Sequence, residues 1–331
     1  MEEIGNETKR AIRRLLDDIP KTKGLVVGDI MLDEYYKGKT KGVSPEFPVP
    51  LLEMDEVHYE LGGASNVAHK LKCLGLKDVM LIGTVGVDMF ADKLRFMFSN
   101  ENIAYFDFTY PGSTTRKIRI VQDGKHICRV DRDACVSAHR GETEDRIVEF
   151  LTGILSTNDE IDFIIVSDYG KGVVSERLCK TISDYKKDHV KVILDPKPCN
   201  RKVYKFLDFD VITPNREEAR QLLQKSVGIA DGLVKGVYSL YDAPCVLTCG
   251  DEGYALFYGG SRIRWGKALE QNVKDVCGAG DIFNAILGIC LANGECLETA
   301  CSVANVAAAL SITQEGTGKV TKDMLRRIIR E

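Results

Sequence analysis

The sequence contains no long hydrophobic run, no long run of basic residues and no pair of cysteines spaced as C-x-x-C. Without an apolar span or a signal-like N-terminus, we expect a cytoplasmic protein with no membrane partner. A net charge of −4 offers little to a polyanion, so nucleic acid is excluded as an expected partner. Because the eleven cysteines are odd in number, we expect reduced core thiols rather than disulfides or a zinc site.

Two nucleotide-binding signatures are also missing. The sequence has neither the G-x-x-x-x-G-K-[ST] loop nor the lysine and catalytic-loop residues of protein kinases. Its G-A-G-D stretch does not follow a first strand with the pattern G-x-G-x-x-G, which argues against a dinucleotide-dependent dehydrogenase. Any nucleotide must therefore be bound by a different arrangement.

The order of predicted elements indicates an α/β fold. From residue 142 onward, predicted helices alternate with short apolar runs typical of buried strands, at 163–168, 190–195 and 211–213. This alternation predicts a doubly wound, mostly parallel sheet flanked by helices. Within 34–60 and 103–131, predicted strands follow one another without helices, so we expect both segments to form a small β-sheet lid inserted in a single domain, 1–331.

A loop of small residues near the end of the chain precedes an amphipathic helical pattern. Gly278, Ala279 and Gly280 lack bulk, so an anion can approach the unpaired N–H groups of the helix start. Asp281 would repel that anion, and its carboxylate is useful there as a proton acceptor, which predicts a general base. The alternative is an ordinary helix start with an acidic residue in its first turn.

A second glycine loop, Gly62-Gly63, opens another predicted helix. Taken alone, Asn66 in this stretch is better explained as a helix cap than as a ligand contact. Asp33 follows the first predicted strand, and ligands of open α/β sheets bind beyond the carboxyl ends of strands. Asp33 is thus either a contact for sugar hydroxyls or a solvated loop residue.

Acidic and amide side chains follow several predicted strands, and we expect them at one edge of the sheet: Asp33, Asp168, Asp195, Asn215, Glu218 and Asp281. Magnesium prefers carboxylate, amide and water oxygens, and it neutralises the charge of a triphosphate. Together with the two glycine loops, this set predicts metal-assisted phosphoryl transfer to a polyol.

Three motifs stand in the order and spacing of the ribokinase-like, or PfkB, carbohydrate kinases, which the chain resembles over nearly its whole length. They are G-G-x-x-N-x-A at 62–68, T-P-N-x-x-E at 213–218 and G-A-G-D at 278–281. Within that family, GDIMLDEYYKG, VSPEFPVP and VSDYGKG resemble the kinases of D-glycero-β-D-manno-heptose 7-phosphate. The resemblance implies an ATP-dependent kinase that phosphorylates the C1 hydroxyl to give heptose 1,7-bisphosphate for ADP-heptose synthesis.

The resemblance also implies roles for single residues. Asp281 would deprotonate the acceptor hydroxyl, while Gly278, Ala279 and Gly280 would donate to the transferring phosphoryl group. Contacts to the sugar would come from Asp33, Gly62, Gly63 and Asn66. Contacts to Mg²⁺, through its waters, and to ATP would come from Asn215, Glu218, Lys171, Lys197, Thr248 and Gly250.

The chain departs from the family pattern at two places. Cys277 replaces the usual threonine before the anion loop, and 314–317 reads Q-E-G-T where K-x-G-T is frequent. The second departure leaves open how the base is bound and whether a monovalent cation is used. Many relatives continue into a nucleotidyltransferase domain with H-x-G-H, which this sequence lacks, so we expect a kinase that works with a separate adenylyltransferase and phosphatase.

Alternate residues of a strand share one face, which places Lys117 and Arg119 together. Two such cations predict a clamp for the 7-phosphate, with a solvated strand face as the alternative. Because the lid strands lack covering helices, we also expect a homodimer through the lid. The remaining alternatives are a ribokinase-like kinase of another sugar or nucleoside, and a non-catalytic sugar or nucleotide sensor, against which Asp281 argues.

Overall fold

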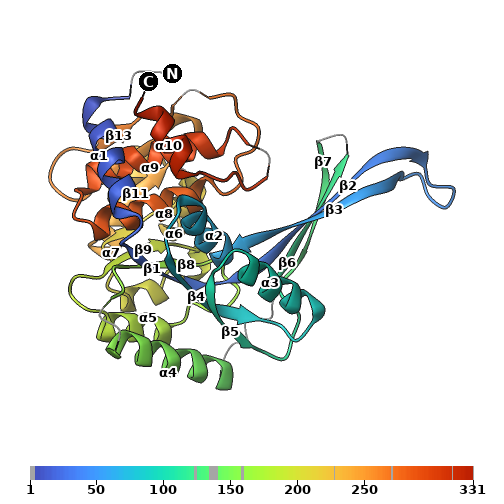
Figure 1. Cartoon of the computed structure of the whole chain (residues 1–331), viewed down its shortest axis with the longest axis horizontal. Helices are drawn as coiled ribbons and strands as arrows, with labels where there is room; N and C mark the ends of the chain where they lie inside the picture. Colours follow the sequence, from blue (N-terminus) through green and yellow to red (C-terminus); the bar gives the residue numbers. More distant parts are fainter. Residues whose placement is uncertain are drawn as a thin grey trace.

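The computed structural model describes residues 4–122, 125–133, 141–157, 160–226, 228–269, 271–314 and 316–330. Figure 1 shows a layered body of helices and strands from which a long β-hairpin extends to one side. Among the helices of these residues, none combines the length and apolar character needed to span a bilayer.

The body is organised around a nine-stranded sheet in the order β13-β12-β11-β10-β9-β8-β1-β4-β5. From β11 to β5 all neighbours in this order run parallel, whereas β12 and β13 pair antiparallel at one edge. The predicted mostly parallel sheet is therefore confirmed. Its strands are β1 (Lys23–Gly28), β4 (Asp78–Val85), β5 (Ala104–Thr109), β8 (Phe163–Ser167), β9 (Lys191–Asp195), β10 (Val211–Ile212), β11 (Cys245–Thr248), β12 (Tyr254–Phe257) and β13 (Arg264–Gly266).

Helices cover both faces of this sheet because successive side chains of each buried strand point to opposite sides. In β1, Val26 packs into one hydrophobic cluster, while Leu25 and Val27 pack into the other. The first cluster is completed by α1 (Asn6–Asp18), α2 (Ala64–Leu74), α3 (Met89–Asn100), α8 (Ala279–Ala292), α9 (Leu297–Ser311) and α10 (Lys322–Ile328). The second is completed by α4 (Glu142–Thr157), α5 (Glu176–Tyr185), α6 (Arg216–Leu222) and α7 (Ala230–Tyr241).

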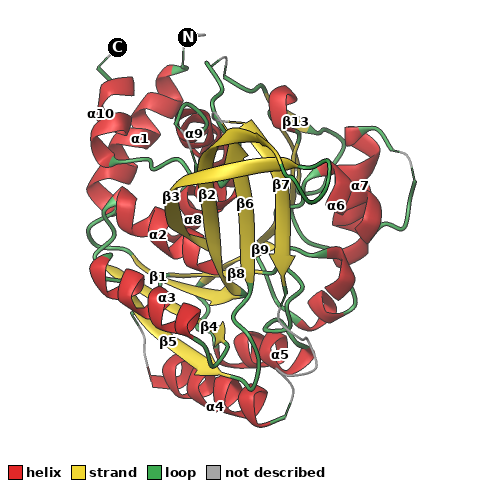
Figure 2. Ribbon diagram, turned by 90° about the vertical axis from the view of Figure 1, so that its right-hand side faces the viewer, coloured by secondary structure: helices red, strands yellow, loops and turns green. Residues whose placement is uncertain are grey.

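A separate four-stranded sheet, here called the lid sheet, has the order β3-β2-β6-β7. Its strands are β2 (Ile30–Val43), β3 (Pro50–Gly63), β6 (Arg116–Gln122) and β7 (Lys125–Arg132). Figure 2 shows them side by side in front of the body. β2 and β3 extend beyond the predicted 34–60 segment at both ends. Pro45 and Pro48 lie in the connection between the two strands, outside their ladder.

The prediction that all strands of 103–131 belong to the lid is wrong for the first of them. β5 pairs in parallel with β4 and forms the edge of the nine-stranded sheet. Its Phe108 is buried in the hydrophobic cluster that α4 covers, so this strand has a helical partner after all. The sequence Q-D-G-K at 122–125 predicts a hairpin turn, but its Asp123 and Gly124 lie outside the described residues.

The close approach of β1 and β8 at the functional edge of the sheet gives a stability prediction. A Cβ atom at Gly28 would lie 1.9 Å from the carbonyl oxygen of Ser167, so Gly28→Ala forces the strands apart. We expect Gly28→Ala to lower the free energy of unfolding by about 1–3 kcal/mol, measured by urea titration. Gly153→Ala is the control: a Cβ there meets nothing within 4 Å in α4, so this variant should gain about 0.5–1 kcal/mol. Equal stability of the two variants would contradict the strand packing.

Candidate active site

The carboxyl ends of the main-sheet strands and the start of α8 enclose a cavity of about 230 Å³. Strand ends gather here because parallel strands finish at the same edge of a sheet. Asp168, Tyr169, Asp195 and Asn284 contribute to its wall. Of the residues predicted from sequence, the cavity is lined by Asp168, Asp195, Lys197, Asn215, Glu218, Thr248, Gly278, Gly280 and Asp281.

The anion loop has the geometry that its glycines predict. Gly278 is the N-cap of α8 and has a left-handed φ of 76°, which favours glycine. A Cβ atom at this position would also lie 2.9 Å from the side-chain nitrogen of Asn66. Ala279 is the first residue of α8, and the positive end of the helix dipole therefore faces the cavity.

Asp281 is buried in the first turn of α8 and holds two side-chain contacts. The amide of Asn66 donates to its Oδ2, and the hydroxyl of Tyr169 donates to its Oδ1 at 3.1 Å. Burial raises the pKa of the Asp281 carboxyl above its ordinary value, and Asn66, the charge of Lys70 and Tyr169 oppose that rise. The site thus favours a proton-accepting carboxylate that is more basic than a solvated one.

The interpretation of Asn66 as a helix cap is wrong. Gly63, with φ of 58°, is the N-cap of α2, and Asn66 lies within the first turn with its side chain on Asp281. Gly62 allows the side chain of Asp33 to approach the backbone closely, since a Cβ atom at position 62 would lie 2.9 Å from the carboxyl carbon of Asp33. The second glycine loop therefore faces the first, although 215 residues separate Asn66 from Asp281.

Tyr169 was not among the predicted residues, and neither was the carboxylate that positions it. Asp29, directly after β1, accepts backbone N–H groups of Tyr169 at 2.8 Å, Lys171 at 3.0 Å and Val173 at 3.1 Å. These bonds fix the loop after β8 and hold Tyr169 beside Asp281. The signal in the sequence is the position of Asp29 and Tyr169, each just beyond a buried strand.

The T-P-N-x-x-E motif both starts a helix and lines the cavity. Asn215 Oδ1 accepts from the backbone of Glu218 at 2.9 Å, and Glu218 Oε2 accepts from the backbone of Asn215 at 3.0 Å, which is a capping box. Glu218 Oε1 lies 3.6 Å from Lys197 Nζ. Thr248 forms an isolated β-bridge with Asn215.

Two predicted nucleotide contacts are not among the described residues that line this cavity. Lys171 Nζ lies 2.6 Å from Asp133 Oδ1, in an ion pair next to the end of β7. Gly250 has φ of 62° and begins the short 3₁₀ helix η4 (Gly250–Glu252). The structure thus brings Lys197 to the cavity and leaves Lys171 with a partner from the lid side.

The donor set of the cavity fits a divalent cation. Burial, with the charge of Asp29, raises the pKa of Asp168 to about 7. Burial, with the charges of Glu218 and Asp281, raises the pKa of Asp195 well above its ordinary value. A hard cation such as Mg²⁺ would relieve this repulsion through oxygen donors. Across the described ranges, no three carboxylate, imidazole or thiolate side chains converge to hold a metal directly.

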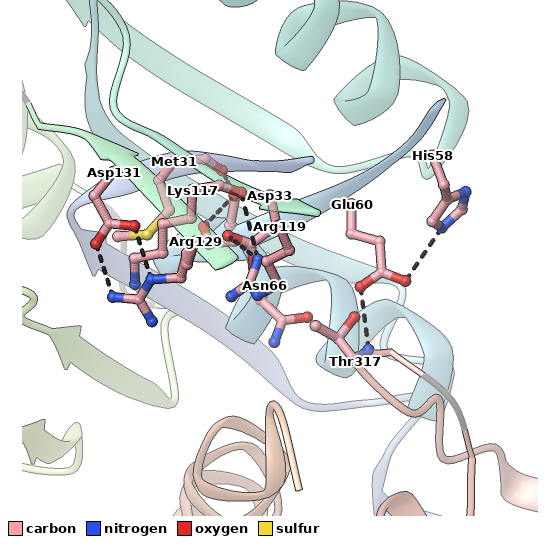
Figure 3. Close-up of polar contacts among 12 residues, drawn as sticks. Met31, Asp33, His58, Glu60, Asn66, Lys117, Arg119, Arg129, Asp131 and Thr317 are labelled. Atoms are coloured by element: carbon pink, nitrogen blue, oxygen red, sulfur yellow. Dashed lines mark hydrogen bonds and ion pairs between the residues drawn. The ribbon is translucent and has the colours of Figure 1, made fainter. Parts of the chain in front are cut away.

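The lid sheet brings a charged group toward the same site (Figure 3). Asp33 pairs with Lys117 in the β2–β6 ladder, and Arg119 Nη1 lies 3.2 Å from Asp33 Oδ1. Lys117 Nζ lies 4.9 Å from the centre of the Tyr169 ring, which links the lid sheet to the neighbour of Asp281. Burial raises the pKa of Asp33, and Arg119 opposes this. Asp33 therefore belongs to the lid sheet, although its sequence position suggested the rim of the main sheet.

Arg129 is a third cation that the sequence analysis missed. It lies directly opposite Arg119 in the β6–β7 ladder and binds Asp131 through two bonds of 2.8 and 2.7 Å. Alternation within one strand reveals Lys117 and Arg119, but finding Arg129 requires the register of the hairpin. We call Lys117, Arg119 and Arg129 the cationic cluster.

Comparison with known proteins gives the family. The profile of the pfkB family carbohydrate kinases matches residues 21–324. Bifunctional protein HldE of Helicobacter hepaticus is 32% identical over 319 residues, covering 93% of this chain and 64% of the relative. Its namesake from Geobacter sulfurreducens is 33% identical over 304 residues, covering 90% and 61%. The chain thus spans less than two thirds of the length of these relatives.

Solved structures agree on the fold. Ribokinase from Thermotoga maritima superposes with a TM-score of 0.72 at 19% identity, covering 94% of this chain and 100% of that one. Phosphofructokinase-2 from Escherichia coli, in complex with potassium, gives a TM-score of 0.76 at 16% identity, covering 93% and 98%. The fold is ribokinase-like, and the chain belongs to the pfkB family of carbohydrate kinases.

Proposed function

We propose that this kinase transfers the γ-phosphoryl group of ATP to the C1 hydroxyl of D-glycero-D-manno-heptose 7-phosphate. The product would be heptose 1,7-bisphosphate for ADP-heptose synthesis in the cytoplasm, after action of a phosphatase and an adenylyltransferase. The observation that carries the proposal is the cationic cluster, Lys117, Arg119 and Arg129, on the lid sheet beside Asp33. A substrate with a phosphate far from the reacting hydroxyl uses such a cluster, and the 32–33% identity to HldE proteins supports the same choice.

Buried oxygen atoms between the lid sheet and Asp281 are suited to sugar hydroxyls. Within the described residues, Asn66 Oδ1 is buried and accepts no hydrogen bond, and the buried Asp33 Oδ1 has the ion pair with Arg119 at 3.2 Å. A buried acceptor without a donor is costly, so a sugar hydroxyl that donates to Asn66 Oδ1 and shares Asp33 with Arg119 would be favourable here. The acceptor hydroxyl would then lie against Asp281, which removes its proton as the phosphoryl group is transferred.

The cavity at the strand ends would bind the triphosphate of ATP, with Lys197 and the α8 N-terminus meeting its charge. Asn215 and Glu218 would hold Mg²⁺ through waters, and the bound ion would neutralise charge on the phosphates. Thr248 and Gly250 would lie near the base, whereas Lys171 would first have to leave Asp133. The potassium bound by the phosphofructokinase-2 structure supports a test for monovalent-cation dependence.

The role of Asp281 predicts a specific loss of turnover. Asp281→Asn keeps the shape of the side chain but removes the base, so kcat should fall by about 10²–10⁴-fold, with nucleotide affinity nearly unchanged. In the wild type, kcat/KM should decrease as the pH falls through the raised pKa of Asp281, because only the carboxylate accepts a proton. Steady-state kinetics across pH measures both. Near-normal kcat in Asp281→Asn would refute the assignment.

The substrate proposal is tested with a panel of sugars and ATP, using product mass and coupled ADP release. The wild type should prefer heptose 7-phosphate over free heptose and over other phosphosugars or nucleosides. Equal efficiency for free heptose and its 7-phosphate would refute the substrate and the clamp together.

The double variant Lys117→Ala with Arg119→Ala should reduce kcat/KM for the sugar phosphate by about tenfold or more per lost contact. The KM for ATP at fixed sugar should change far less. Lys125→Ala is the control, because Lys125 is an exposed cation at the start of β7, opposite Gln122 and not opposite a member of the cationic cluster.

We also propose that the lid sheet forms a homodimer. Exposed apolar side chains gather on the β2–β3 hairpin, namely Val43, Phe47, Val49, Leu51 and Met54. A second copy would bury this surface isologously. Light scattering at micromolar concentration should show a dimer for the wild type and a smaller species for Phe47→Asp. Phe96→Asp, on α3, is the matched control, since Phe96 is 64% exposed and Phe47 is 73% exposed. A monomeric wild type would refute the dimer.

A further inference from the structure

Lys70 is a fully buried lysine beside the active site, outside all three family motifs. It lies on α2 one turn after Asn66 and has 0% exposure. Its ammonium group donates to the backbone carbonyl oxygens of Thr317 and, at 2.6 Å, of Gly318. Burial of a cation is costly, and burial lowers the pKa of Lys70, so the position of this charge needs a physical reason.

The ammonium group lies directly under the anion loop. A Cβ atom built on Gly278 would be 3.5 Å from Lys70 Nζ and 3.4 Å from its Cε. The charge of Lys70 also acts on Asp281, which follows Gly278 by three residues. It lowers the pKa of the Asp281 carboxyl and so opposes the effect of burial. Lys70 thus lies beside the helix start that would meet the phosphoryl group, and its charge acts on the carboxylate that would meet the acceptor hydroxyl.

Other polar and charged groups surround Lys70 and Asp281. Lys70 is affected by Asp281, Cys73, Glu60 and Lys319, in addition to its own desolvation. Asp281 is affected by Asn66, Lys70, Tyr169, Asp33 and Asp195. Asp33 and Asp195 are both acidic, so Lys70 is the cation that offsets their repulsion of Asp281.

The carbonyl partners of Lys70 are themselves fixed from the lid side. The backbone N–H of Thr317 donates to Glu60 Oε2 at 3.1 Å, and Glu60 lies on β3 (Figure 3). The two peptide groups that flank Thr317 are therefore both held, one by Glu60 through the N–H and the other by Lys70 through the carbonyl. This arrangement leaves the ammonium little freedom to turn away from the anion loop.

We propose that Lys70 is a positioning residue that supplies a fixed positive charge beneath the anion loop and keeps Asp281 in its proton-accepting form. The inference rests on the proposed role of Asp281 as the base. An alternative role, in which Lys70 only ties 317–318 to α2, requires hydrogen bonds but no charge. A neutral hydrogen-bond donor at position 70 could replace Lys70 in the second role but not in the first.

The test is Lys70→Gln, which retains a donor for the carbonyl groups but removes the charge. We expect kcat/KM for the sugar to fall by about tenfold or more, and the acid limb of its pH profile to move up by about one unit or more, because Asp281 loses its cation. Lys72→Gln is the matched control, since Lys72 lies on the same helix and donates to the carbonyl of Lys77 at 2.8 Å. Its profile should match the wild type. A folded Lys70→Gln with an unshifted acid limb would overturn the proposal.

A second variant covers the case in which Lys70→Gln does not fold. Lys70→Ala leaves room for a small cation, so propylammonium should restore activity whereas 1-propanol, of similar length but uncharged, should not. Equal rescue by both, or rescue by neither, counts against a role for the charge. Asp281→Asn separates the two claims. Normal turnover of Asp281→Asn would refute the role of Asp281 as the base. If Asp281→Asn loses turnover but the pH profile of Lys70→Gln is unshifted, only the role of Lys70 is refuted.

Discussion

The arrangement of the active site depends on the burial of one carboxylate. Asp281 has been removed from water at the start of α8, so its oxygens need donors from the protein. Asn66 comes from α2, and Tyr169 comes from the loop after β8. Satisfying Asp281 therefore brings together two glycine loops and a strand end that are distant in the sequence.

The same requirement explains why the surrounding loops are held so firmly. Asp29 accepts three backbone N–H groups of the loop that carries Tyr169, and the backbone of Asp29 accepts from Ala64 N at 3.0 Å, where α2 begins. Asp29 thus connects β1 both to the loop that carries Tyr169 and to α2, the helix that carries Asn66. The proposed role of Asp281 as a base needs such a frame, because catalysis by a positioned base depends on geometry as much as on pKa.

The sequence was sufficient wherever a local pattern decided the structure. The alternation from residue 142 onward predicted the parallel sheet, and the small residues at 278–280 predicted a loop that opens α8. It was insufficient wherever a distant partner decided. Asn66 is an excellent cap in isolation, yet its partner is 215 residues away. The sequence predicts β5 as a lid strand because α4, the helix that shares a hydrophobic cluster with it, comes later in the chain. Lys70 carries no local sign that its ammonium would meet the carbonyls of 317–318.

The joint between the two sheets restricts how the protein can deform. β1 ends at Gly28 and β2 begins at Ile30, so Asp29 alone connects them, and its side chain and backbone are both bonded. The inner part of the lid sheet, with Asp33, is thereby attached to the body without a flexible linker. Irregular pairing occurs further out, between Lys37 and Gly38 and between Thr40 and Gly42. Bulges locally bend and twist a strand, so the hairpin is most easily reshaped beyond residue 37, where bending leaves Asp33 and its ion pair with Arg119 in place.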